Sequence, residues 1–258
     1  MIEAMPLPVF SITSVPNGLA SRMHKSKLLV SFKADRGCFV NAANKKRYKG
    51  VTTTAKQTFY RDYVYKHVRP SSHVPTKTTG IRRGNQVDSE MSNWADGETN
   101  AASTPHHPYS AKLATALLKH QLIPIAGQVP VFDDDLMIAT AVDMVCYSTR
   151  SKCIVLCEIK CGWNGNAYQK ASGRMHSTMA DFDNSPSNQH QIQLALTHYL
   201  FGVTFGTSAH ESYVVRAADN GIYFYKLEEK VLRRIGPLCI AMTNNTKHHS
   251  RKKKPNNY

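Results

Sequence analysis

The chain has 258 residues, with 33 Lys or Arg against 18 Asp or Glu, and its formal net charge at pH 7 is +15. This length is enough to bury a sizeable core in one domain, and the charge favours a polyanionic partner such as nucleic acid. The sequence contains no apolar run long enough to span a bilayer and no apolar stretch after a basic start, so we expect neither a membrane helix nor a signal peptide.

Two terminal segments are expected to lie outside the folded part of the chain. Residues 1–22 carry one acid, Glu3, and several Ser, Pro and Gly residues. We expect a flexible lead-in there rather than a mitochondrial presequence, because the segment has a single arginine. Residues 241–258 form a strongly basic tail that we expect to be disordered, and this composition suits nuclear import or nonspecific DNA attachment. A single domain is therefore predicted for residues 23–240.

Nearly half of the positive charge lies in residues 22–83, which contain sixteen Lys or Arg against two acids. Aromatic residues are interleaved with these cations, so the segment could neutralise phosphates while its rings stack on unpaired bases. The alternative is a solvated basic face whose aromatic rings belong to the core. We expect Lys45, Lys46 and Arg47 to contact DNA.

Three helices are expected in the first half of the chain. Residues 23–83 are predicted to be mainly helical, with one helix over residues 52–67 that begins at a threonine cap. A second helix is expected to start at Arg82 and Arg83 and to carry Asp88; because a helix N-terminus attracts anions, the two arginines are candidates to hold a terminal phosphate. A third, amphipathic helix is expected over residues 110–120.

The middle of the chain is predicted to form strands. Residues 125–132, which include Gln128, and residues 136–144 are expected to pair around an acidic turn, Asp133 to Asp135, that we expect to be solvated. From residue 141 to residue 162, two apolar strands rich in β-branched residues flank a polar turn over residues 148–152.

Three charged residues interrupt these apolar strands. Because an unpaired carboxylate is costly to bury, Asp143, Glu158 and Lys160 need a metal, a counter-charge or solvent. With the turn centred near Arg150, Asp143 falls opposite Cys157 or Glu158, close enough for two carboxylates to share one hard cation. Glu158 and Lys160, two residues apart on a strand, point to the same face. The simpler alternative is a hairpin with a Glu–Lys pair and an unrelated aspartate.

Three of the six cysteines, Cys153, Cys157 and Cys161, are spaced by four residues on one predicted strand. Residues four apart on a strand are separated by about 13 Å, so these thiols cannot share one zinc ion. We expect them to be small apolar fillers behind Glu158. Unpaired cysteine within strands is typical of a reducing intracellular compartment, and with the basic tail it favours the nucleus over the mitochondrion.

The last third of the chain is predicted to contain a loop, a helix and a hairpin. Residues 162–187 are polar and are expected to form a flexible loop beside the charged strands, with Lys170 and Arg174 as candidate DNA contacts. A helix is expected over residues 188–201, which include Gln191 and Tyr199. A final hairpin, residues 213–216 with 222–227 around an Asn-Gly turn, is expected to complete the sheet.

Asp143 followed by Glu158-Ile159-Lys160 resembles the D…(D/E)-x-K core of the PD-(D/E)XK nuclease superfamily. The nearest likeness is to its branch of RecB-like nucleases, lambda exonuclease and mitochondrial genome maintenance exonucleases. Gly84, Val87 and Met91 fit the helix that opens the domain in that branch. The likeness covers roughly residues 50–227, and it implies an α/β fold: a restriction-endonuclease-like catalytic core over residues 84–227, with a central mixed sheet flanked by helices.

The resemblance also implies a cofactor, Mg²⁺ or Mn²⁺, held by Asp143 and Glu158. Asp88 is a further candidate metal ligand, at a position that is usually His or Glu in the family. The metal would activate water and neutralise charge on the phosphate, while Lys160 orients or deprotonates that water. Gln191 matches the glutamine that relatives aim at the scissile phosphate. Tyr199 and Gln128 are auxiliary candidates, the latter where relatives often have Glu.

The sequence as a whole therefore predicts a metal-dependent DNA nuclease. The resembled branch favours an end-dependent exonuclease that acts in DNA replication, recombination or repair. The alternatives are a nonspecific endonuclease, an RNA-processing nuclease that shares the phosphate chemistry, and a non-catalytic basic DNA-binding protein derived from a nuclease. The expected partner is DNA, as double-stranded ends or single strands, and the sequence does not define an oligomeric state.

Overall fold

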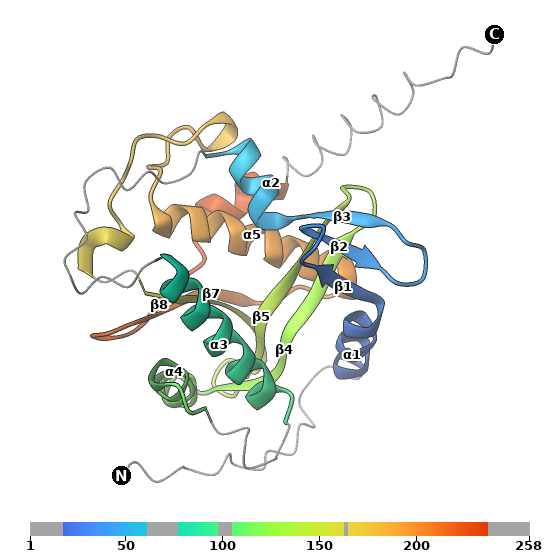
Figure 1. The fold of residues 1–258 in the computed structure, drawn as a ribbon, viewed down its shortest axis with the longest axis horizontal. Helices are drawn as coiled ribbons and strands as arrows, with labels where there is room; N and C mark the ends of the chain where they lie inside the picture. The colour runs from blue at the N-terminus through green and yellow to red at the C-terminus, as the bar shows by residue number, and fades with distance from the viewer. Residues whose placement is uncertain (1–17, 61–76, 98–104, 163–164, 237–258) are drawn as a thin grey trace.

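An eight-stranded mixed sheet runs through the centre of the molecule, with helices on both of its faces (Figure 1). The computed structural model describes residues 18–60, 77–97, 105–162 and 165–236. The arrangement confirms the expected α/β class with a central mixed sheet flanked by helices. Within these described ranges, no helix is long and apolar enough to cross a membrane.

The elements follow one another in a mixed order of helices and strands. They are α1 (Leu19–Leu29), β1 (Val30–Lys33), β2 (Cys38–Asn41), β3 (Arg47–Gly50), α2 (Val51–Thr58), α3 (Lys77–Ala95), α4 (Pro108–Lys119), β4 (Leu122–Asp133), β5 (Ile138–Ser148), β6 (Cys153–Cys161), α5 (Pro186–Phe205), β7 (Glu211–Ala218) and β8 (Gly221–Lys226). Single 3-10 turns lie at Gly165–Tyr168 and Ser177–Met179, and a further helix covers residues 229–236.

Strand β5 is the centre of the sheet because three strands pair with it. Strand β4 pairs antiparallel along one whole edge, from Ile138 to Ser148. The other edge is divided: β3 pairs in parallel with residues 138–139, and β6 pairs antiparallel with residues 144–148. Residues 140–143 therefore lie at a fork where β3 and β6 separate. The last β5–β6 pair is Met144 with Cys157, which confirms the hairpin register expected from the polar turn.

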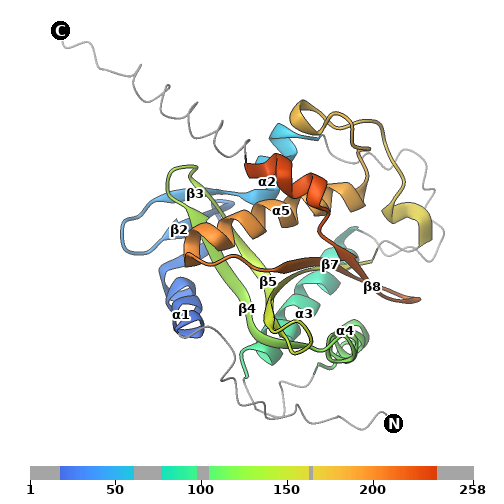
Figure 2. The ribbon, with the colours of Figure 1, turned by 180° about the vertical axis from the view of Figure 1, so that it is seen from behind.

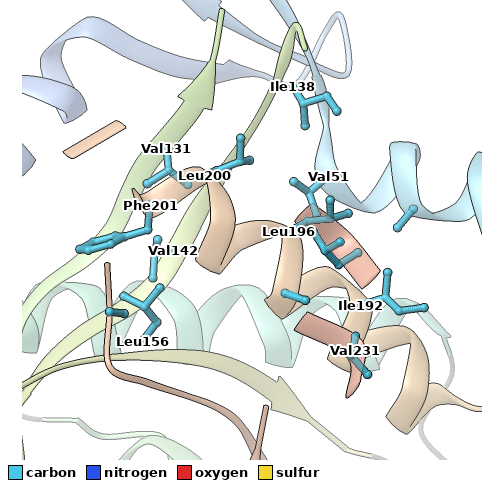
Figure 3. Close-up of a cluster of buried hydrophobic side chains, with 14 of the residues drawn as sticks. Val51, Val131, Ile138, Val142, Leu156, Ile192, Leu196, Leu200, Phe201 and Val231 are labelled. Atoms are coloured by element: carbon cyan, nitrogen blue, oxygen red, sulfur yellow. The ribbon is translucent and has the colours of Figure 1, made fainter. Parts of the chain in front are cut away.

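One face of the sheet carries the larger core, which Figure 3 shows in close-up. Helix α5 crosses this face, and Ile192, Leu196 and Leu200 pack from it against the sheet. Helices α1 and α2 and residues 229–236 contribute further buried side chains, and the strands contribute Val131, Val142, Leu156 and others. The predicted apolar face of this helix is confirmed, but the helix is buried on nearly every side between residues 190 and 197. It begins at Pro186 because the Ser185 hydroxyl accepts the N–H of Asn188 at 3.2 Å.

Helices α3 and α4 cover the opposite face with a second core. Figure 2 shows the molecule from the side opposite to that of Figure 1. Cys146, Cys153 and Cys157 are buried in this second core, with Cys161 packed at its margin. The predicted role of the strand cysteines as apolar fillers behind Glu158 is therefore confirmed. The helix expected over residues 110–120 is also present, and it starts two residues earlier at Pro108.

The N-terminal region differs from the predicted helical segment. After α1, residues 30–50 form three short antiparallel strands that extend the sheet beyond β5. All three strands have only four residues, and β1 and β3 carry exposed cations, so their sequences lack the longer apolar alternation that identifies a strand. The predicted lead-in ends at residue 18, because α1 starts at the fully buried Leu19. Residues 1–17 and 241–258 lie outside the described residues.

Three local predictions need correction. Helix α2 starts at Val51 after Gly50, so no threonine side chain caps it, and residues 61–67 of the predicted helix lie outside the described residues. The loop after β6 is packed rather than flexible, since Met175, Met179 and Phe182 enter the larger core. In the acidic turn, Asp133 is buried and accepts the N–H groups of residues 135 and 136. Only the two acids that follow it are exposed.

Candidate active site

Asp143 lies at the fork of the sheet, where the local backbone turns its side chain away from the core. The pairing of β4 with β5 passes from Gly127–Met144 to Val129–Val142 and leaves Gln128 and Asp143 between them. Gln128 has a positive φ of 47°, and Val142 and Val145 both face the larger core although they are three residues apart. The strand faces therefore shift by one residue at this level, an irregularity that re-aims side chains beside functional sites.

Two hydrogen bonds fix the Asp143 carboxylate. Its Oδ2 accepts the backbone N–H of Ile159 at 2.8 Å, two residues beyond Cys157, the last β6 residue that pairs with β5. Its Oδ1 accepts from the Gln128 side chain at 3.3 Å, so the predicted auxiliary glutamine does reach the predicted metal ligand. The carboxylate thus bridges the two strands at the point where they separate.

Strand β6 brings Glu158 and Lys160 to the same side of this fork. The Lys160 Nζ donates to Glu158 Oε1 at 2.6 Å, and Glu158 is 8% exposed. The two side chains share a face because they are two residues apart on the strand. Asp143 falls opposite Glu158 when the β5–β6 register is extended by one residue. The sequence therefore predicted correctly that these three groups lie together.

Helix α3 adds Asp88 from the side of the smaller core. Burial raises the pKa of Asp88 to about 6, with the ammonium of Lys160 opposing and the carboxylate of Glu158 reinforcing the shift. Asp88 is thus close enough to both β6 residues to affect their charge. Asp88 was predicted only through the family resemblance, and the structure places it near Asp143 and Glu158.

Charges in this group act strongly on one another. Burial and the neighbouring Glu158 raise the pKa of Asp143 well above its usual value, and the backbone bond from β6 only partly offsets this. Burial alone would lower the pKa of Lys160, but the carboxylates of Glu158, Asp143 and Asp88 outweigh it and raise that pKa. Three carboxylates therefore surround one ammonium, and the group carries excess negative charge when all are ionised.

These donors are of the chemical kind that a hard divalent cation takes, because Mg²⁺ and Mn²⁺ prefer carboxylate oxygens. A cation would also offset the burial and the mutual repulsion that together raise the pKa values of Asp88 and Asp143. Among the described residues, no three His, Cys, Asp or Glu side chains already surround a common point as metal ligands would. The ammonium of Lys160 instead holds one Glu158 oxygen.

Two predicted residues lie elsewhere. Both ends of the Gln191 amide are used by the backbone after β8: the side chain donates to the Lys226 carbonyl at 3.1 Å and accepts from the Glu228 N–H at 3.0 Å. Tyr199 donates to Asp133 at 3.4 Å, at the far end of β4. These contacts do not join either side chain to the carboxylates, so the roles of Gln191 beside the scissile phosphate and of Tyr199 as an auxiliary residue stay predictions.

The two arginines on α3 also differ from prediction. The helix begins at Lys77, so Arg82 and Arg83 lie in its second turn and not at its N-terminus. Arg82 is exposed. The Arg83 guanidinium lies 5.1 Å from the Tyr109 ring and lies against Gly162, directly after β6. A helix-terminus phosphate site at these two arginines is therefore excluded, although Arg83 lies close to the end of β6.

The other predicted DNA contacts lie away from the carboxylates. Lys45 and Lys46 lie in the β2–β3 turn and Arg47 begins β3, and Lys46 pairs with Asp134 at 2.9 Å. Arg174 pairs with Asp183 at 3.2 Å on the surface, and Lys170 is exposed on the same loop. These positions are compatible with a broad polyanion-binding surface, but they do not line the fork.

Sequence reasoning missed three residues next to Lys160. His190 on α5 is buried, and burial together with the nearby Lys160 ammonium lowers its pKa well below the usual value. Its Nδ1 lies 3.3 Å from the Tyr168 hydroxyl. Arg216 pairs in register with Lys160 across β6 and β7. No local signal marks the first two, but an arginine inside the apolar strand Tyr213–Ala218 is a visible anomaly.

Comparisons with known proteins add little to this geometry. No family model matches the sequence, and no curated protein matches it. Among solved structures, the one titled "Crystal structure of SSO0001" is 13% identical in sequence, with 62% of this chain and 74% of that chain covered and a TM-score of 0.28. This similarity is too distant to assign a fold or an activity, so the chain's own residues carry the functional argument.

Proposed function

We propose that this chain is a metal-dependent DNA nuclease with a PD-(D/E)XK type of active site. The observation that carries the proposal is the convergence of Asp88, Asp143, Glu158 and Lys160 at the β5–β6 fork. These residues belong to three elements and are spread over more than seventy positions of the chain. Nothing in the packing of an α/β core requires three acids at one place. The chain's charge of +15 supports a nucleic-acid substrate.

Asp143, Glu158 and Asp88 would hold the Mg²⁺ or Mn²⁺ ion. When bound, such an ion polarises a water molecule and neutralises charge on the phosphate. The chain itself orients the ligands. The Ile159 N–H and the Gln128 amide keep the Asp143 carboxylate in one orientation, so Gln128 acts as a positioning residue.

Without a bound ion, the carboxylates of Glu158, Asp143 and Asp88 raise the pKa of Lys160, so its side chain is an ammonium that donates hydrogen bonds at neutral pH. This charge state favours the first of its two expected roles. Lys160 would therefore orient the attacking water and stabilise the negative charge that develops on the phosphate oxygens.

Substitution of the two strand carboxylates tests the proposal. Asp143→Asn and Glu158→Gln should each lower Mg²⁺-dependent DNA cleavage by roughly a thousandfold or more, because the loss of a metal ligand removes several kcal/mol of transition-state stabilisation. The matched control is Asp135→Asn, an exposed acid in the β4–β5 turn, which should cleave as the unaltered protein does. Undiminished turnover by either strand variant at saturating Mg²⁺ would refute the assignment.

End dependence is a second part of the proposal, and it now rests on the family resemblance alone, because the helix-terminus phosphate site is excluded. Linear and covalently closed circular duplexes of one sequence separate the possibilities. Progressive loss of the linear form with an intact circle would support an exonuclease in DNA replication, recombination or repair. Comparable nicking of the circle would instead indicate a nonspecific endonuclease with the same active site.

One observation favours a second candidate function, a non-catalytic DNA-binding protein. The Lys160–Glu158 pair at 2.6 Å occupies a carboxylate oxygen that a metal needs. If this pair persists in excess Mg²⁺, the chain should bind DNA without any metal-dependent cleavage. Isothermal titration with Mg²⁺ and Mn²⁺, and with Asp143→Asn as the control, measures directly whether an ion displaces the lysine.

A further inference from the structure

Beyond Lys160, the same face of the sheet carries one arginine and three tyrosines. Strand β7 places Arg216 beside Lys160, and β8 places Tyr223 beside Arg216. Paired residues of neighbouring strands point to the same face, so the three side chains form a row across three strands. Tyr225 follows two residues along β8, and Tyr168 packs over the row from its 3-10 turn. We call Tyr168, Arg216, Tyr223 and Tyr225 the arginine–tyrosine cluster.

The guanidinium of Arg216 lies among the tyrosine rings. Its Cζ is 4.5 Å from the centroid of Tyr223, 4.9 Å from that of Tyr168 and 5.9 Å from that of Tyr225. The rings of Tyr168 and Tyr225 contact each other at 5.1 Å. Arg216 is 5% exposed and Tyr168 is 1% exposed, whereas Tyr223 and Tyr225 are only half-buried. The cluster therefore has a buried cationic base and an accessible aromatic rim.

The opposite face of the same strands shows what simple core packing would use. There Ile159, Val215 and Phe224 fill the corresponding row with apolar side chains in the smaller core. The row that contains Lys160 and Arg216 instead holds two cations next to tyrosine rings, and Tyr168 and Tyr225 also pack with Leu194 and Val214. Cations beside aromatic rings suit a ligand that carries both negative charge and bases.

The position of the cluster defines what could reach it. Strand β8 ends the sheet, and Figure 1 shows it at the rim of the molecule, beyond β7. Tyr223 and Tyr225 are consecutive residues of one face of this strand, about 7 Å apart along it. The strand register places these rings on the same face as Lys160, two strands away from it.

We propose that the arginine–tyrosine cluster binds an unpaired DNA segment next to the carboxylates. Phosphates of the segment lie near Lys160 and Arg216, and its bases stack on the rings of Tyr223 and Tyr225, as single-strand-binding surfaces combine cations with aromatic platforms. A duplex cannot use the rings, because its bases are already stacked on one another. The cluster makes single strands and frayed ends the preferred substrate of the proposed nuclease. The substrate preference rests on the proposed nuclease function, whereas the binding of a single strand by the cluster does not.

Binding measured in EDTA tests the cluster separately from cleavage. A fluorescent single strand and the blunt duplex of the same sequence are titrated with the unaltered protein and with the double variant Tyr223→Leu, Tyr225→Leu, which keeps apolar bulk but removes both rings. The variant should bind the single strand about tenfold more weakly or worse, while its affinity for the duplex changes by about twofold at most. The double variant Tyr223→Phe, Tyr225→Phe keeps the rings and should bind the single strand nearly as well as the unaltered protein.

The matched control is Tyr213→Leu, a half-buried tyrosine on the opposite face of β7 that packs against Phe224. It should leave both affinities unchanged. Equal losses for single strand and duplex in the leucine double variant, or no loss for the single strand, would overturn the proposal. If the leucine variants fail to fold by circular dichroism, weaker single-strand binding by an abasic strand than by the intact strand supports stacking, and equal binding refutes it. A protein that binds in this way but never cleaves would refute the nuclease and leave the cluster intact.

Discussion

The fork of β5 and β6 and the hairpins of β1 to β3 both carry many charges, but they hold them in opposite ways. At the fork, three carboxylates from α3, β5 and β6 gather around the single ammonium of Lys160. On the hairpins, cations lie at the surface, and some have a carboxylate close by, as Lys46 has Asp134 at 2.9 Å. The fork concentrates unbalanced charge in a small, partly buried space, whereas the hairpins spread charge over a surface.

This difference determines which region could act on a reacting group and which could only attract a charged partner. Charges that must act on a reacting group need a fixed position and little water around them, and only the fork provides both. Exposed cations attract a polyanion from a distance, and those with a local acid contribute less than a count of residues suggests. The charge imbalance of residues 22–83 therefore overstates what that segment can add to binding.

After the two strand carboxylates, the largest expected effect is that of Lys160. Lys160→Ala should lower the cleavage rate at saturating DNA by a factor of several hundred, corresponding to about 3–4 kcal/mol for one strong donor to the developing anion. Lys119→Ala, an exposed lysine at the end of α4, is the control and should have no effect. Steady-state kinetics on a short labelled DNA give both values. A rise in KM with an unchanged kcat would show that Lys160 serves binding and not the chemical step.

The sequence predicts the strand part of the fork because the relevant signals are local. A polar turn between two β-branched runs fixes the hairpin register, and the register places Asp143 opposite Glu158. The same reasoning found the hairpin of β7 and β8 from its Asn-Gly turn. Asp88 is 55 positions from Asp143, and only a family likeness suggested it, since no periodicity reports which helix crosses a sheet.

Other parts of the site depend on contacts that sequence does not reveal. Helix α5 is buried on nearly all sides, so its pattern could not show which polar residue turns towards the carboxylates, and His190 rather than Gln191 is the one near Lys160. Arg216 reaches the row beside Lys160 through a parallel pairing across a long crossover. The register of such a pairing is set by the whole core and not by a turn.

Gly127 lies where α3 packs on β4, next to a contact with α1, and its substitution should have the largest effect on stability. A Cβ at this position would lie 2.5 Å from the Cα of Ser92, so α3 packs directly on β4 there. The Gly127 N–H also donates to Asp96, which pairs with Lys27 of α1. Gly127→Ala should displace α3, which carries Asp88, and lower the free energy of unfolding by about 2–3 kcal/mol.

Gly84 supplies the matched control for that substitution. It lies within α3 with nothing within 4 Å of an added Cβ. Gly84→Ala should raise the free energy of unfolding by roughly 0.5–1 kcal/mol, because alanine favours the helix. Urea denaturation followed by circular dichroism measures both variants. Equal effects of the two substitutions would show that the close approach of α3 to β4 does not determine stability.

Asp88 should link the fork to pH. Its pKa rises from 3.8 to about 6 in the folded chain, so between these values the folded state binds more protons than the unfolded state, and stability falls as the pH rises. Asp88→Asn removes this loss. In EDTA, the variant should be more stable than the unaltered protein by about 1–3 kcal/mol at pH 7, with no advantage near pH 3.5. An advantage of equal size at both pH values would contradict the raised pKa.

The smallest expected effect concerns the hairpin cations, where the structure refines the charge count. Lys46 is paired with Asp134, whereas Arg47 is exposed and makes no ion pair with any described residue. Each phosphate contact that is lost should reduce the slope of log K against log salt by about 0.9 for duplex DNA. Arg47→Gln should show this full reduction if the hairpin contacts DNA, and Lys46→Gln should show clearly less.

Arg150→Gln, an exposed arginine on the β5–β6 turn at the other end of β5, is the control and should leave the slope unchanged. Because all three substitutions remove one charge, a slope reduced equally by all of them would mean that net charge alone attracts the DNA. A reduction confined to Arg47 would place the DNA path over the β2–β3 turn, and an unchanged slope for Arg47→Gln would exclude that turn from the path.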